Sequence, residues 1–295
     1  MDEDGKLNQQ KQIDVVTGWG MIINIFLAVL KIIFGVIINS VALIADGVHS
    51  FSDLFTDVVV IIASRASKRP PDATHPYGHG KIETIGSVVI GIVLLVIGGG
   101  IGWTAIIAMI NQQMNFPGPI VVIIAFLSVV SKEVLFHVTR KIAMQIHSTS
   151  LYANAWHHRS DALSSLAVIL GGGLSLIGFG YGDHLAGLVV GMMVMAVAGK
   201  IIFDALKELS EHALDEEVLE KIKDILNNYE DICQWHKLRT RKIGSEIFVD
   251  MHVLVDPLMT VKESHNLTLD IERNLEKAIS LPINVLIHIE PCEKI

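Results

Sequence analysis

Charged residues are scarce in this chain. Asp, Glu, Lys and Arg make up 18% of its 295 residues, aromatic residues 6%, and hydrophobic residues 51%. The mean hydropathy is +0.50, and the apolar residues are clustered rather than spread along the sequence. Soluble domains carry about 25% charged residues. The shortage of charge therefore excludes an ordinary soluble protein and indicates one that lies in a membrane.

Cysteine is also scarce, because the sequence contains two cysteines, Cys233 and Cys292. Two cysteines cannot build a disulfide framework in a chain of this size, and the absence of a C-x-x-C motif disfavours thiolate metal sites. The polar residues 1–14 contain no apolar run of the kind found in secretory signal peptides, so we expect no cleaved leader.

Six apolar segments are long enough to cross a bilayer, which takes about 20 residues. The second and fifth are the least apolar, because they also contain ionisable residues. We expect an all-α membrane bundle of six helices over residues 16–206, preceded by a cytoplasmic segment at residues 1–15. The predicted spans are Val16–Ile38, Ser40–Ala63, Ile82–Met109, Gly118–Val138, Leu151–Phe179 and His184–Ala205.

Basic residues are confined to one side of this bundle. The loops after the first, third and fifth spans contain neither Lys nor Arg. Short loops rich in basic residues face the cytoplasm, which predicts that both termini are cytoplasmic. The basic residues on that side are Lys6, Lys11, Arg65, Lys68, Arg69, Lys81, Arg140 and Lys141.

Residues 207–295 differ from the rest in composition. They contain 18 acidic and 11 basic residues, a net charge of −7 out of the −8 of the whole chain. This balance disfavours nucleic acid as a partner. The pattern predicts a cytoplasmic α+β domain (αββαβ, metallochaperone-like) whose small core favours dimerisation. Its predicted elements are helix Glu216–Asn228, strands Ile232–Ile243 and Ser245–Val255, helix Val261–Ile279 and strand Asn284–Glu290.

Two His-x-x-x-Asp pairs lie inside the predicted spans. His49 and Asp53 belong to the second span, and His157 and Asp161 to the fifth. Spacing of four residues puts each pair on one helix face, and a carboxylate in hydrocarbon is costly unless it has a partner or faces water. Two such faces offer two imidazole nitrogens and two carboxylate oxygens, which predicts a tetrahedral site for zinc or a similar metal.

The first pair belongs to a longer polar stripe that includes Asp46 and Asp57. The alternative to ligand binding is that these groups hydrogen-bond between helices. We interpret His49 and Asp53 as ligands, because the whole stripe is too costly for packing alone, and the other two aspartates as residues near the ends of the cavity.

Two further polar residues fall inside predicted spans. His158 is rotated by about 100° from its neighbour His157, so we expect it to pack between helices rather than bind metal. Lys31 in the first span either pairs with an acidic residue of another helix or extends its amine to the interface, and the sequence leaves both open.

Two histidine clusters lie outside the spans. The loop after the second span holds Asp72, His75 and His79, which fits either a metal site or a solvated loop with stray histidines. The C-terminal region holds four histidines, two of them in predicted strands where a metal could link neighbours. With the acidic residue that follows the last, this cluster consists of His236, His252, His265, His288 and Glu290.

In combination, these spans, motifs and loops resemble the cation diffusion facilitator family, most closely its bacterial zinc/proton antiporters. The resemblance covers Trp19 to Cys292. It implies a homodimeric secondary transporter, not an enzyme, in the cell (inner) membrane. Such a protein exports a cytoplasmic divalent metal, most readily Zn²⁺, in exchange for external protons by alternating access. Zinc would also be a structural or regulatory ion.

The resemblance also assigns roles to residues. It implies a transport site, a loop site, a cytoplasmic site at the dimer interface and a cytoplasmic interlock between subunits. The transport site would be His49, Asp53, His157 and Asp161; the loop site Asp72, His75 and His79; the cytoplasmic site His236, His252, His265, His288 and Glu290; the interlock Lys81 with Glu211.

The chain departs from those antiporters at two positions. They have Asp where His49 stands, and the additional imidazole favours zinc or cobalt over manganese. Glu290 replaces their Asp and is longer by one methylene, which changes the geometry of the cytoplasmic site.

Two other classes of function fit parts of the pattern. An intramembrane metalloenzyme would use the same His and Asp to activate water, but there is no H-E-x-x-H motif and four protein ligands leave no open position. A metal-sensing membrane scaffold would recruit partners through residues 207–295, and would bind metal without measurable flux.

Overall fold

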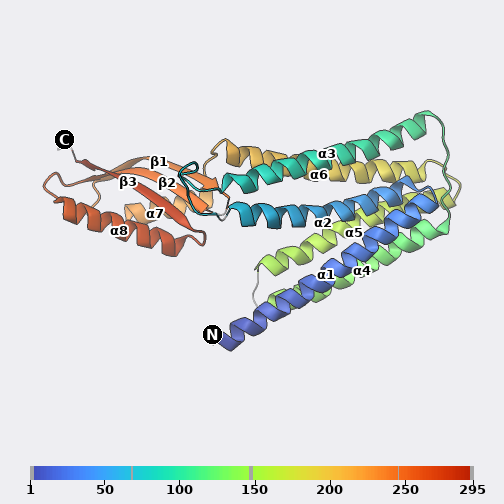
Figure 1. Cartoon of the computed structure of the whole chain (residues 1–295), viewed down its shortest axis with the longest axis horizontal. Coiled ribbons are helices and arrows are strands. Elements are labelled where there is room, and N and C mark those ends of the chain that lie inside the picture. Colours follow the sequence, from blue (N-terminus) through green and yellow to red (C-terminus); the bar gives the residue numbers. More distant parts are fainter. Residues whose placement is uncertain (1–2, 68, 146–148, 245, 293–295) are drawn as a thin grey trace. The chain divides into compact units, whose positions relative to one another are not determined.

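The computed structural model describes residues 3–67, 69–145, 149–244 and 246–292. The described chain contains eight helices and three strands (Figure 1). It forms two compact units, Met1–Val59 with Ile90–Lys200, and Val60–Val89 with Ile201–Ile295. The domain limits expected near residues 15 and 206 remain predictions.

Six long helices correspond to the predicted spans. The helical membrane region expected from the sequence is confirmed, although α1 begins well inside the segment expected to precede the bundle and α4 runs beyond its predicted end. The helices are α1 Glu3–Ile37, α2 Val41–Ser67, α3 Lys81–Ile110, α4 Pro119–Gln145, α5 Thr149–Leu176 and α6 Gly182–Leu209.

Among the described residues, four helices are long and apolar enough to cross a bilayer: Val15–Ile37 within α1, and α3, α4 and α6. Only 28–39% of their most apolar windows is buried. Their remaining apolar side chains point outward, as expected of helices surrounded by lipid. α2 and α5 fall short because they carry the polar residues, as the sequence predicted.

Small residues allow the helices of the first unit to pack closely. α4 packs against both α1 and α5. On α3 and α6, a Cβ atom added to Gly98 would lie 2.9 Å from the carbonyl oxygen of Gly191. Backbones this close leave no room for a side chain, which is how helices commonly associate in lipid.

The buried carboxylate of Asp183 caps the start of α2. Its Oδ1 accepts a hydrogen bond from the Ser40 hydroxyl at 2.5 Å, and its Oδ2 accepts one from the Val41 amide at 2.8 Å. The Asn115 amide donates to the same Oδ2 at 3.1 Å. A negative charge at a helix N-terminus is favourable and satisfies otherwise unpaired N–H groups.

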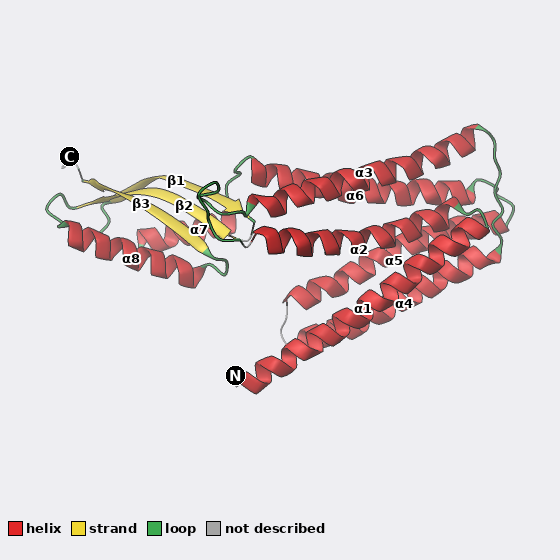
Figure 2. Ribbon diagram, viewed as in Figure 1, coloured by secondary structure: helices red, strands yellow, loops and turns green. Residues whose placement is uncertain are grey.

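The second unit contains a three-stranded sheet in the order β1-β2-β3 (Figure 2). β1 pairs with β2 in antiparallel fashion, and β3 pairs with β2 in parallel fashion. The α+β domain with αββαβ order is confirmed. Its elements are α7 Glu216–Asn227, β1 Gln234–Ile243, β2 Glu246–Val255, α8 Val261–Ala278 and β3 Ile283–Pro291.

Both short helices cover the same face of the sheet. Alternate residues of β2, such as Val249 and Met251, form one buried cluster with Ile222 of α7 and Ile271 of α8. Because successive side chains of a strand point to opposite faces, His252 projects from the face that these helices do not cover.

A disulfide joins Cys233 to Cys292. The sequence excluded a disulfide framework but did not foresee this single bridge. The Cys233 amide donates to the Leu254 carbonyl and the Cys292 amide to the Val255 carbonyl, which brings the start of β1 and the end of β3 to the same end of β2.

The helix-covered face of the sheet should dominate the stability of this unit. Ile271→Ala should lower its free energy of unfolding by about 2–5 kcal/mol, because the side chain is completely buried. Hydrogen exchange of the β2 amides measures the change. The adjacent exposed substitution Arg273→Ala serves as control, and equal exchange rates in the two variants would contradict the assigned core.

Candidate metal-binding sites

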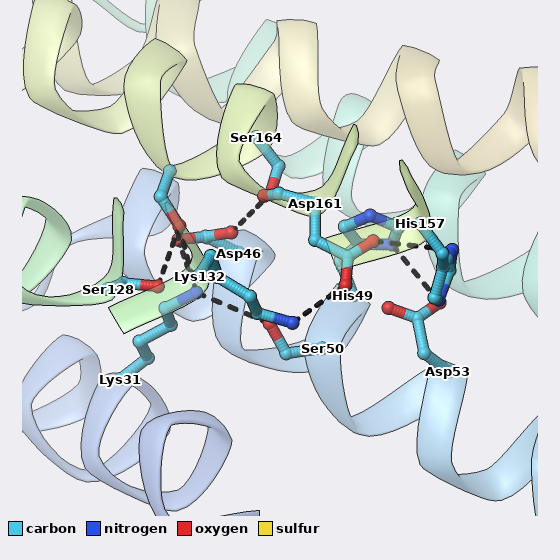
Figure 3. Close-up of polar contacts among 11 residues, drawn as sticks. Lys31, Asp46, His49, Ser50, Asp53, Ser128, Lys132, His157, Asp161 and Ser164 are labelled. Atoms are coloured by element: carbon cyan, nitrogen blue, oxygen red, sulfur yellow. Dashed lines mark hydrogen bonds and ion pairs between the residues drawn. The ribbon is translucent and has the colours of Figure 1, made fainter. Parts of the chain in front are cut away.

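Three predicted ligands meet between α2 and α5. One ligand atom from each of His49, Asp53 and Asp161 lies within 4.8 Å of the other two (Figure 3). His49 and Asp161 are buried. Nitrogen and carboxylate oxygen donors at this spacing can close on one divalent cation.

The fourth predicted ligand, His157, lies beside this group rather than in it. Its Nδ1 is 3.7 Å from Asp161 Oδ1, and 54% of its side chain is exposed. The structure therefore gathers three of the four predicted transport ligands, with His157 next to one of them.

The site has a basic neighbour that the sequence analysis missed. Nζ of Lys132 on α4 lies 2.7 Å from Oδ2 of Asp161, and both side chains are buried. The available signal was a lysine inside the fourth predicted span, which needs a partner or an exit to water. Its partner could not be read from the sequence, because it lies on another helix.

The alternatives for Lys31 are resolved in favour of an ion pair. Its Nζ lies 2.8 Å from Oδ2 of Asp46, and neither side chain is exposed. Hydroxyl groups of Ser164 and Ser165 donate to the two oxygens of Asp46 at 2.6 Å and 2.7 Å. Asp46 is thus occupied in helix packing, while the side chain of Asp57 lies outside the described part of the chain.

His158 packs against α1. It is buried, and a Cβ atom added to Gly20 would lie 3.4 Å from His158 Nε2. This position agrees with the interpretation of His158 as a packing residue.

The predicted loop residues Asp72, His75 and His79 also form a group with ligand atoms within 4.8 Å of one another. Oδ1 of Asp72 accepts hydrogen bonds from the Thr74 hydroxyl, the Thr74 amide and the His75 amide. These bonds hold the pKa of Asp72 well below its usual range, and the bond from the Thr74 hydroxyl has the largest effect. The loop thus presents a carboxylate whose ionised form is stabilised, beside two imidazoles.

The cytoplasmic cluster forms a histidine row across the sheet. The strand register places His236 opposite His252, and His252 opposite His288. Glu290 joins them: its Oε1 lies 2.7 Å from Nδ1 of His252 and its Oε2 lies 3.0 Å from Nε2 of His236. The hydrogen bond to His252 lowers the pKa of Glu290.

Two residues predicted for the cytoplasmic site lie outside its compact group of possible ligands. Nε2 of His288 is 3.7 Å from Oε1 of Glu290, but the compact group of possible ligands is His236, His252 and Glu290. His265 is on α8, which packs on the other face of the sheet. Within one chain, the structure does not bring His265 to the site that the sequence assigned to it.

The expected interlock residues are paired within one chain. Nζ of Lys81 lies 3.2 Å from Oε1 of Glu211, and Arg241 approaches Oε2 of the same carboxylate at 3.7 Å. Nearby, Glu208 accepts hydrogen bonds from the Thr84 hydroxyl and from the Gly244 amide. The start of α3 is thereby tied to the end of α6 and to the β1–β2 turn.

Comparison with known families agrees with this geometry. Residues 19–210 match the model of the cation efflux transmembrane domain, and residues 214–292 match that of the cation efflux protein cytoplasmic domain. The chain belongs to the cation efflux family. This is the cation diffusion facilitator family that its motifs resemble. Members of the family are secondary transporters that move divalent metal cations out of the cytoplasm, not enzymes.

Similar proteins come from several kingdoms. Metal tolerance protein C1 of Arabidopsis thaliana is 35% identical over 287 residues, which are 92% of this chain and 61% of that protein. The chain thus spans less than two thirds of that relative. Uncharacterized transporter MJ0449 of Methanocaldococcus jannaschii is 35% identical over 253 residues, which are 86% of this chain and 89% of that one.

Two other similar proteins are named for metal transport. Manganese efflux system protein MneP of Bacillus subtilis is 28% identical over 278 residues, 92% of this chain and 93% of its own. The metal-bound C-terminal domain of the CzcD transporter from Thermotoga maritima is 29% identical over 26% of this cation efflux protein and 94% of its own chain, with a TM-score of 0.25.

Metal binding by the histidine row can be tested by substitution. His252→Ala should reduce the zinc bound per chain, because His252 is the central residue of the row and contacts Glu290. Elemental analysis after equilibrium dialysis of the full chain measures this loss. His212→Ala, which alters an exposed histidine bonded to the Ala213 carbonyl, is the control. Equal zinc content in both variants would refute the cytoplasmic site.

Proposed function

We propose that this chain exports a divalent metal cation, zinc in the first place, in exchange for protons. The observation that carries the proposal is the meeting of His49, Asp53 and Asp161 between two helices of the membrane unit. His49 and Asp161 are buried and Asp53 is partly buried, and such groups in membrane helices are costly unless they serve a cation. Membership in the cation efflux family supports a divalent metal as that cation.

The donor set favours zinc. Imidazole nitrogen with carboxylate oxygen is a common zinc environment, whereas manganese prefers oxygen donors. A rotation of His157 toward Asp161 would complete the tetrahedral His₂Asp₂ set expected from the sequence. The name of the relative MneP records manganese as the cargo of that protein, so metal competition is the relevant measurement.

Proton exchange follows from the chemistry of the same side chains. A free imidazole has a pKa of about 6.5, so a histidine changes charge near neutral pH. Metal binding needs neutral histidine and ionised aspartate, so loading the site displaces protons. Opening toward a more acidic side would favour reprotonation and release, and helix rocking around the site would give alternating access.

The remaining features fit a homodimer in the cell (inner) membrane. We assign residues 1–15 and 207–295 to the cytoplasm and residues 16–206 to the bilayer, on the placement of the basic loops. The match to the family's cytoplasmic domain supports dimerisation through the C-terminal region. Bound zinc at the cytoplasmic and loop sites would stabilise or regulate that dimer. An interlock between subunits at the membrane surface would require Lys81 and Glu211 to exchange their pairing within one chain for one across the dimer.

Proton coupling can be tested in vesicles that contain the purified chain. An imposed pH gradient, acidic on the side that receives the metal, should accelerate zinc flux, because reprotonation there releases the ion. Collapse of the gradient with a protonophore should return the flux to its basal rate. Zinc flux that ignores the gradient would exclude antiport, and bound zinc without any flux would favour the metal-sensing scaffold.

The site assignment can be tested by an isosteric change. Asp53→Asn should reduce zinc flux at least about tenfold, since it removes a charged ligand and costs on the order of 1.4 kcal/mol or more. Glu133→Gln is the matched control, because Glu133 lies on α4 and pairs with His137 and Arg159 rather than with the site. Full zinc flux in Asp53→Asn would show that this site does not take part in transport.

A third variant tests the choice of metal. His49→Asp should shift competition between zinc and manganese toward manganese, because it exchanges an imidazole for a hard oxygen donor. Competition is measured as inhibition of ⁶⁵Zn flux by each metal in vesicles. An unchanged preference would show that His49 does not select the metal.

A further inference from the structure

We propose that Lys132 is a tethered cation that occupies Asp161 while the transport site is empty, and that incoming metal must displace its ammonium group. This inference rests on the proposed function, because it assumes that Asp161 binds the transported ion. It assigns to Lys132 a role in setting metal affinity and release.

The ammonium group of Lys132 is in contact with Asp161. Lys132 Nζ lies 2.7 Å from Oδ2 of Asp161, and the two side chains are only 2% and 6% exposed. Within the described part of the chain, Asp161 is the acidic partner of this lysine. The opposite oxygen, Oδ1, faces Nδ1 of His157 at 3.7 Å. The carboxylate therefore already holds a cation on one side and has a further nitrogen donor on the other.

A metal ion and the Lys132 ammonium would compete for Asp161. A zinc ion bound to a carboxylate oxygen sits about 2.0–2.2 Å from it. An ammonium on the other oxygen of the same group would lie within a few ångströms of that ion, where a buried environment screens their repulsion poorly. The long, flexible lysine stem can carry the charge away from Asp161. Metal and Lys132 are thus alternative partners of this carboxylate.

The same helices contain a second buried lysine, whose surroundings differ from those of Lys132. Lys31 and Asp46 form a second buried pair, at 2.8 Å, but here each partner is held by further hydrogen bonds. Ser164 and Ser165 donate to Asp46, and Lys31 also donates to Ser50 and Ser165. Among the described residues, Asp46 does not belong to any group of possible metal ligands. Figure 3 shows the two lysines on separate aspartates.

The displacement has a consequence for the transport cycle. An empty site with two ionised aspartates would leave uncompensated charge inside the bilayer. With Lys132 on Asp161, the empty site is partly neutralised without a metal ion. The lysine would therefore ease the return of the empty carrier and weaken metal binding enough for release.

Two substitutions at Lys132 should change metal affinity in opposite directions. Lys132→Met keeps the length and removes the charge, so zinc should bind at least about tenfold tighter and zinc flux should slow. Lys132→Arg should bind zinc more weakly than the unmodified chain, because a guanidinium holds a carboxylate through two parallel bonds.

The measurement is calorimetric titration of Zn²⁺ into the full chain in detergent. A His252→Ala/Asp72→Asn background removes contributions from the cytoplasmic and loop sites. The matched control is Lys31→Met, which removes the other buried lysine and should leave the zinc dissociation constant unchanged. If Lys132→Met is unstable without metal, its zinc-induced rise in melting temperature should still exceed that of the unmodified chain.

The outcomes separate this inference from the proposed function. Unchanged or weaker zinc binding in Lys132→Met would overturn the competition, as would identical affinities in the Met and Arg variants. The response to Asp53→Asn distinguishes the two failures. If the proposed function is wrong, Asp53→Asn leaves zinc binding and flux unchanged; if only the competition is wrong, Asp53→Asn still reduces them.

Discussion

The cost of a carboxylate inside a bilayer governs this structure. The helices of the membrane unit place several aspartates among apolar residues, and each has a distinct compensation. Asp183 receives the N–H and hydroxyl donors at the start of α2. Asp46 is neutralised by Lys31 and two serine hydroxyls. Asp53 and Asp161 instead meet each other across two helices, a repulsive arrangement that becomes favourable when a cation lies between them.

The aspartates with protein partners and those that face each other have different roles, one in helix packing and the other in the proposed transport. The saturated pairs hold α1, α2, α5 and α6 in place and gain nothing from a metal ion. The unsaturated pair lies beside His49, whose nitrogen completes a donor set suited to zinc. Lys132 stands between the two classes, since it neutralises Asp161 through one oxygen and leaves the other available. In the proposed cycle, this intermediate state lets the site load a metal ion and lets the empty carrier return.

Much of this could be predicted from the sequence, for reasons that are local. The spacing of His49 and Asp53 fixes a shared helix face, and alternation along β2 fixes the face that carries His252. What could not be predicted depends on helix packing. Lys132 is an isolated lysine in an apolar span, and only the packing of α4 on α5 selects Asp161 as its partner. The position of His265 also depends on packing, because within one chain its helix covers the face of the sheet opposite the histidine row.

The most direct test of the account is to locate the metal itself. Anomalous scattering at the zinc absorption edge, from crystals of the full chain grown with Zn²⁺, shows where the ions lie. The account predicts a peak between α2 and α5, within bonding distance of His49, Asp53 and Asp161, with the Lys132 ammonium moved away from the carboxylate. Peaks confined to the loop and the histidine row, with none between these helices in zinc-saturated protein, would contradict it.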